Sequence, residues 1–157
     1  MVTTKKSLVK WTALTVTALL IGVGVAFALN IPGLGKCEKI KAANGLVTIP
    51  VAAVNDGKAH FYKFAADGKE IAFFLVKAGD GTIRGAFDSC DVCFKEKKGY
   101  EQQGDFMICK NCNKKFATNR IGPHAIGGCN PSYFPHAEAG GNVVIRVEDL
   151  KAGARFF

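Results

Sequence analysis

The chain has 157 residues, a formal net charge of +8 and a hydrophobic share of 48%. This length suits one domain with a short additional segment. The sequence offers no Ser-His-Asp constellation, no glycine-rich phosphate loop and no paired catalytic carboxylates, which leaves no case for a hydrolase or a nucleotide-dependent enzyme.

The N-terminal segment has the composition of a membrane helix. Lysines within the first ten residues precede an uncharged run of 18 residues at 12–29. Such a run is just long enough to span the hydrocarbon core, and the lysines hold its first end in the cytoplasm. We therefore expect a single N-terminal membrane anchor. A signal peptide cleaved after Ala28 is the alternative, because residues 26–28 fit the small-x-small pattern, and the protein would then be secreted.

The remaining chain is expected to lie outside the cytoplasm. The predicted organisation is an anchor or signal peptide at 1–30, a linker at 31–45 and an exported domain at 46–157. Residues 31–157 hold 18 bases and 13 acids, so the basic excess is modest. We expect no nucleic-acid partner, and we interpret the charge as a solvated surface facing anionic lipid or an acidic protein.

The first part of the exported domain predicts a mainly β fold. Apolar or alternating runs at 46–54, 59–65, 70–77 and 82–87 are separated by Asp-Gly and Gly-Asp-Gly sequences. These sequences favour tight hairpin turns, so the pattern indicates an antiparallel β-meander. The third run is apolar on both faces and suits a central strand. Pro50 places the first run at a sheet edge or a bulge.

The second part is rich in cysteine. Residues 88–131 contain five of the six cysteines, many lysines and turn residues, with little periodic apolar pattern. We expect a loop segment that something other than a hydrophobic core holds together. A last strand is predicted at 142–147. Four phenylalanines are expected in the core rather than on a redox path: Phe73, Phe74, Phe87 and Phe106.

Two Cys-x-x-Cys pairs predict a metal site. Cys90 and Cys93 are separated by 15 residues from Cys109 and Cys112, a spacing typical of tetrahedral sites. Two intervening residues let both sulfurs of one turn reach the same ion. Thiolates suit zinc, iron, iron–sulfur clusters and Cu(I), so the spacing does not select the metal.

Two other interpretations of the pairs stay open. Six cysteines are an even number, and an exported protein can form disulfides. A disulfide within one pair would indicate a thiol–disulfide oxidoreductase, although such enzymes normally carry one pair at the start of a helix. A c-type haem is excluded, because Phe94 follows Cys93 and Asn113 follows Cys112.

Three further residues are candidates for this site: Cys129, His60 and His124. Cys129 follows two glycines, which permit close backbone approach. It is expected to be a fifth ligand, a replacement ligand or the partner of Cys37 in a disulfide. His60, beside two aromatic residues in the second run, is a candidate ligand or a donor to one. His124, in the loop before Cys129, comes next.

The sequence also resembles a known family. The segments AFDSCDVC, GDFMICKNC and GGCNP lie within residues 56–131, and their combination is similar to the FtrD-like membrane iron–sulfur containing proteins. The resemblance implies a membrane protein linked to iron permease systems, with a role in electron transfer. It implies metal-ligand status for the two cysteine pairs, and for Cys129 and His60.

Two classes of function follow as expectations. The first is a non-enzymatic protein that carries an iron–sulfur cluster or iron outside the membrane and serves an iron permease or another redox protein. The second is a binding module in which a structural zinc, or copper, holds the cysteine-rich loops. A thiol–disulfide oxidoreductase is a third alternative.

Overall fold

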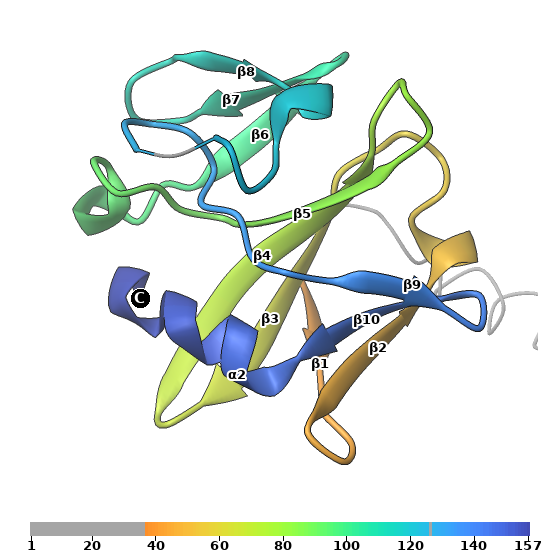
Figure 1. Cartoon of the computed structure of the whole chain (residues 1–157). Helices are drawn as coiled ribbons and strands as arrows, with labels where there is room; N and C mark the ends of the chain where they lie inside the picture. The colour runs from red at the N-terminus through yellow and green to blue at the C-terminus, as the bar shows by residue number, and fades with distance from the viewer. Residues whose placement is uncertain (1–36, 126) are drawn as a thin grey trace, which may run out of the picture. The chain divides into compact units, whose positions relative to one another are not determined.

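The computed structural model describes residues 37–125 and 127–157, so the helix expected at 12–29 lies outside the described part. No helix among the described residues is long and apolar enough to cross a membrane. Strands dominate this part, which confirms a mainly β fold (Figure 1).

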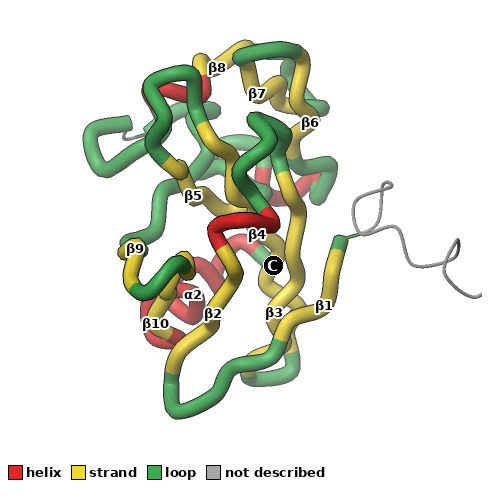
Figure 2. The backbone as a smooth tube through the Cα atoms, turned by 90° about the vertical axis from the view of Figure 1, so that its right-hand side faces the viewer, coloured by secondary structure: helices red, strands yellow, loops and turns green. Residues whose placement is uncertain are grey.

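The first sheet contains the predicted meander. Its strands run in the order β1 (Glu38–Ile40), β3 (His60–Ala66), β4 (Lys69–Lys77) and β5 (Ile83–Phe87). β3, β4 and β5 pair antiparallel in succession, and Asp67 and Gly68 form the first turn with φ of 50° and 75°. These positive angles fit the hairpin turn that the Asp-Gly pair predicts. β1 lies within the expected linker and pairs in parallel with β3 (Figure 2).

The second sheet contains the apolar run at 46–54, which the sequence had placed in the meander. Its order is β2 (Leu46–Pro50), β10 (Asn142–Arg146) and β9 (Ala137–Ala139). β2 pairs with β10 and not with β3, so the run at 46–54 does not belong to the meander. It leaves the sheet at Pro50 and continues as the turn η1 (Val51–Ala53). β2 is an edge strand, as the proline predicts.

A hydrophobic core fills the space between these two sheets. Val47 and Ile145 from the second sheet pack with Phe73 and Leu75 from β4. Leu150 of α2 (Val147–Ala152) and Phe156 of η4 (Gly153–Phe156) close one end of the core. Figure 1 shows α2 beside the strands of this core.

The cysteine-rich segment forms a third sheet, so the expectation of loops without a core is wrong. The sheet has the order β6 (Tyr100–Gln103), β7 (Phe106–Cys109) and β8 (Lys115–Ala117), with η2 (Phe94–Glu96) before it and η3 (Thr118–Arg120) after it. Phe74 and Val76 point from β4 into a second core with residues of this sheet. Since alternate strand residues face opposite sides, β4 serves both cores, as its apolar pattern predicts.

Of the phenylalanines expected in the core, some are buried and one is exposed. Phe73, Phe74 and Phe87 are buried. The prediction for Phe106 is wrong, because its side chain is 44% exposed. Phe106 is the first residue of β7, next to the turn at 104–105, and it borders a surface groove.

Tyr62 should make stability fall at high pH. The side chain is buried and stacks on Phe73 with a centroid separation of 5.4 Å, and burial raises the pKa of Tyr62 to about 12. The unfolded chain loses this proton near pH 10, so between about pH 10 and 12 the unfolded state binds fewer protons and the free energy of unfolding falls as pH rises.

We expect the Tyr62→Phe variant to lose less stability over this interval, by up to about 1.4 kcal/mol per pH unit. Urea unfolding of both proteins between pH 9 and about 11.5 measures the difference, and the other alkaline titrations cancel because they are common to both. Parallel decreases in the two proteins would contradict the expected contribution of Tyr62.

Candidate metal centre

The first cysteine pair lies in a turn that follows β5. The backbone N–H of Cys93 donates to Cys90 Sγ at 3.1 Å, and the chain then enters η2. This bond fixes the distance between the two residues and directs a dipole at the sulfur. A sulfur that accepts such a bond is held in place within the turn.

The second pair closes a tight turn between β7 and β8. Cys109 is the last residue of β7, and its carbonyl oxygen accepts the backbone N–H of Asn113 at 2.8 Å. Asn113 has φ of 58°, a left-handed conformation that asparagine tolerates better than most residues. The turn therefore returns the chain towards Cys109, so that Cys112 lies on the same side.

Five sulfurs from three segments meet at one place. The Sγ atoms of Cys90, Cys93 and Cys129 all lie within 4.8 Å of one another, and the same holds for Cys93, Cys109 and Cys112. Cys93 belongs to both groups, and its sulfur lies 3.5 Å from that of Cys129. No disulfide joins the cysteines of the described part.

Cys129 reaches this place through a loop that a buried tyrosine holds. Gly127 and Gly128, with φ of 78° and 65°, let the chain turn sharply before the cysteine. The hydroxyl of Tyr100 donates to the carbonyl oxygen of Cys129 at 2.7 Å. Sequence reasoning left the role of Cys129 open and missed Tyr100, because a single tyrosine in a short strand carries no distinctive pattern.

Asp88 positions Tyr100 in turn. Its carboxylate accepts the backbone N–H of Tyr100 at 2.6 Å and lies against Gly99, where a Cβ atom would overlap its oxygens. Burial raises the pKa of Asp88, while the bond from Tyr100 opposes this shift. The glycine is required twice, by this close contact and by a φ of 67°.

The five thiols differ in their electrostatic surroundings. Burial raises the pKa of Cys109 to about 11, and burial also raises that of Cys129. The backbone N–H of Lys114 lowers the pKa of Cys112 to about 7. A cation bound between the sulfurs would stabilise all of the thiolates, because metal binding releases the thiol protons.

The centre is enclosed on one side and reaches solvent on another. Cys90, Cys109 and Cys129 are buried, whereas Cys93 and Cys112 are half-buried. The buried side faces Phe74, Met107 and other members of the second core. An ion at this place would therefore be shielded from water except at the edge formed by Cys93 and Cys112.

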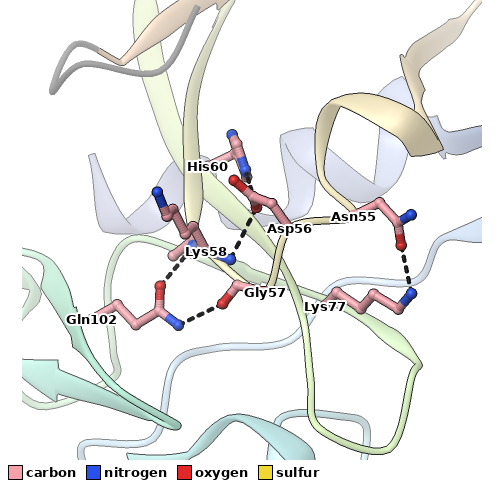
Figure 3. A network of polar contacts seen from close by, with 8 residues as sticks. Asn55, Asp56, Gly57, Lys58, His60, Lys77 and Gln102 are labelled. Carbon is pink, nitrogen blue, oxygen red and sulfur yellow. Dashed lines mark hydrogen bonds and ion pairs between the residues drawn. The ribbon is translucent and has the colours of Figure 1, made fainter.

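The remaining candidates are not part of either cysteine group. The Nε2 atom of His60 lies 2.8 Å from Asp56 Oδ1, which also accepts the backbone N–H of Lys58 at 3.0 Å (Figure 3). His124 and Cys37 are exposed, and neither belongs to a cysteine group among the described residues. A ligand role for His60 therefore stays a prediction without a geometric partner in the structure.

The network around His60 has a structural role of its own. Gln102 of β6 accepts the backbone N–H of Ala59 at 2.6 Å and donates to the carbonyl oxygens of Gly57 and Gly104 at 2.8 and 2.9 Å. Figure 3 shows this side chain between the two backbone segments. Gln102 thus joins the loop before β3 to the third sheet.

A known protein family matches most of the described chain. The family model described as "Membrane iron-sulfur containing protein FtrD-like" matches residues 54–157, a range that includes all five clustered cysteines. Among curated proteins, none matches the chain significantly.

Proposed function

We propose that this chain, which belongs to the FtrD-like family of membrane iron–sulfur containing proteins, holds an iron–sulfur cluster or iron outside the membrane and transfers electrons for an iron-transport partner. The proposed anchor is the apolar run at 12–29. The proposed ligands are the clustered cysteines: Cys90, Cys93, Cys109, Cys112 and Cys129. We leave His60 out of this set, because its Nε2 already bonds Asp56.

The convergence of five sulfurs carries the proposal. Both groups of potential ligands contain cysteine alone, without a carboxylate or an imidazole. Such a donor set suits soft metals and iron–sulfur clusters and disfavours magnesium or calcium. The donors present therefore fit the centre that the family name implies.

Residues of this chain would tune the centre in two ways. Backbone N–H groups directed at Cys90, Cys109 and Cys112 stabilise their negative charge, and such hydrogen bonds raise the reduction potential of sulfur-ligated iron. The aromatic residues of the second core exclude water from the buried side. When bound, the iron centre would supply one-electron transfer.

A structural zinc is the second candidate function. The two cysteine turns resemble the paired turns of zinc ribbons, which need four ligands. The fifth sulfur, 3.5 Å from Cys93, exceeds this requirement. Iron–sulfur clusters are also held by four cysteines, so the number of sulfurs fits both candidates, and the family description is what favours the iron–sulfur centre.

Metal analysis and absorption distinguish these two candidates. We expect the full-length protein, purified without oxygen, to contain iron and acid-labile sulfide, and to absorb visible light that dithionite bleaches. Charge transfer from thiolate and sulfide to iron gives this absorption. A colourless protein with one equivalent of zinc and no iron would overturn the proposal in favour of the structural zinc.

A further inference from the structure

Positive charge is concentrated on one part of the described chain. Residues 95–120 hold seven bases and three acids, whereas the rest of 37–157 holds ten bases and ten acids. The whole excess of positive charge therefore lies between η2 and η3, in the third sheet and the turns around it. The solvated basic surface expected from composition is therefore assigned to this part of the chain.

No base of this segment forms an ion pair within the described part of the chain. All seven are exposed, and every ion pair between described residues uses bases from other parts of the chain. Residues 1–36 and 126 contain no Asp or Glu, so they cannot supply side-chain carboxylates. Unpaired like charges repel one another, which makes a complementary anionic partner favourable.

Three of these bases lie close in sequence to the exposed edge of the cysteine centre. Lys95 follows Cys93 by two residues, and Lys110 and Lys114 lie two residues before and after Cys112. Cys93 and Cys112 are the two half-buried members of the cluster. A partner attracted to the lysines would therefore approach the side of the centre that reaches solvent.

A groove lies on the same sheet. It has a volume of about 440 Å³ and is bordered by Lys115 and Arg120, by the apolar side chains of Phe106 and Phe116, and by Asn130. Its lining contains no carboxylate, and the exposed ring of Phe106 stands at its edge. The groove residues belong to β7, β8, η3 and the loop that follows η3.

We propose that this surface, residues 95–120 with the groove, is the docking site of an acidic protein segment that approaches the cysteine centre. The proposal rests on the proposed function, to which it adds the chemistry of the partner. Charge complementarity steers such encounters and speeds association. We favour a protein over a lipid surface, because a recessed groove accepts a projecting side chain and a bilayer is flat.

Binding of a fluorescein-labelled hexaglutamate peptide to the full-length protein in detergent tests this site at low salt. Two triple variants remove the same charge. The test variant is Lys110→Gln, Lys114→Gln and Lys115→Gln, and the control is Lys41→Gln, Lys63→Gln and Lys151→Gln. We expect the test variant to weaken binding at least about tenfold and the control less than twofold, with binding lost near 0.5 M salt because charges are screened.

Equal weakening by the two variants, or no binding by the unmodified protein, would overturn the proposal. Vesicles of equimolar phosphatidylglycerol and phosphatidylcholine provide the second probe. If the test variant loses vesicle binding but keeps peptide binding, the surface faces lipid and the proposal is also overturned. Peptide binding needs a folded third sheet but does not depend on which metal holds the cysteines. A protein that contains zinc in place of iron would therefore overturn the proposed function and leave the peptide result unchanged.

Discussion

Replacing Cys93 by serine is expected to abolish metal retention. Cys93 is the one residue that belongs to both groups of clustered sulfurs, so its loss leaves neither group complete. A serine hydroxyl is a hard, weakly acidic donor that replaces a thiolate poorly at a soft metal. We expect the iron content of purified Cys93→Ser protein, measured by elemental analysis, to fall below about a tenth of that of the unmodified protein.

Cys37→Ser provides the matched control, because Cys37 is exposed and lies outside the cluster. Its iron content should equal that of the unmodified protein. Loss of iron from Cys37→Ser, or full iron content in Cys93→Ser, would show that the proposed ligand set is wrong. Both variants change the same atom type, so a general effect of removing a thiol would appear in both.

The two cores differ in their cysteine content, so we expect the metal-free protein to lose structure around only one of them. The core between the first two sheets contains no cysteine, whereas the second core contains Cys90, Cys109 and Cys129. Loss of metal should therefore loosen the third sheet while β2 to β5 and β10 remain folded. The coupling between metal and fold is thus confined to one part of the domain.

Local patterns in the sequence predicted the parts of this fold that depend on neighbours in the chain. Asp67-Gly68 predicted the hairpin between β3 and β4, and the apolar run at 70–77 predicted a strand that is buried on both faces. The pairing of β2 with β10 joins Val47 to Ile145, almost a hundred residues apart. No local pattern encodes such a pairing, because it depends on how the whole chain fills the core.

The candidate metal centre, too, was predictable only where it depends on neighbours in the chain. The spacing within each Cys-x-x-Cys pair encodes a turn, so the sequence alone brought forward four of the five clustered cysteines as a set. The position of Cys129 depends on Tyr100 and on the path of a loop after η3. The third sheet was missed because its strands have only three or four residues, too few to show a period.

Phe134→Ala is expected to cost about 3–5 kcal/mol of unfolding free energy. Phe134 lies in a loop, yet its side chain is 1% exposed. Its ring stands edge-on to Phe73, with a centroid separation of 5.4 Å, and 5.1 Å from Phe87. It also presses on Gly85, where a Cβ atom would approach it to 2.9 Å, and this glycine has no side chain with which to refill the cavity.

Urea unfolding of Phe134→Ala and Phe106→Ala measures this loss against a control of the same chemistry. Phe106 is 44% exposed, and truncating it should change stability by less than about 1 kcal/mol. Phe134 packs in the core that lacks cysteine, so the folded fraction of Phe134→Ala should keep its metal. Equal losses in the two variants would mean that the loop after Cys129 is not anchored by this ring.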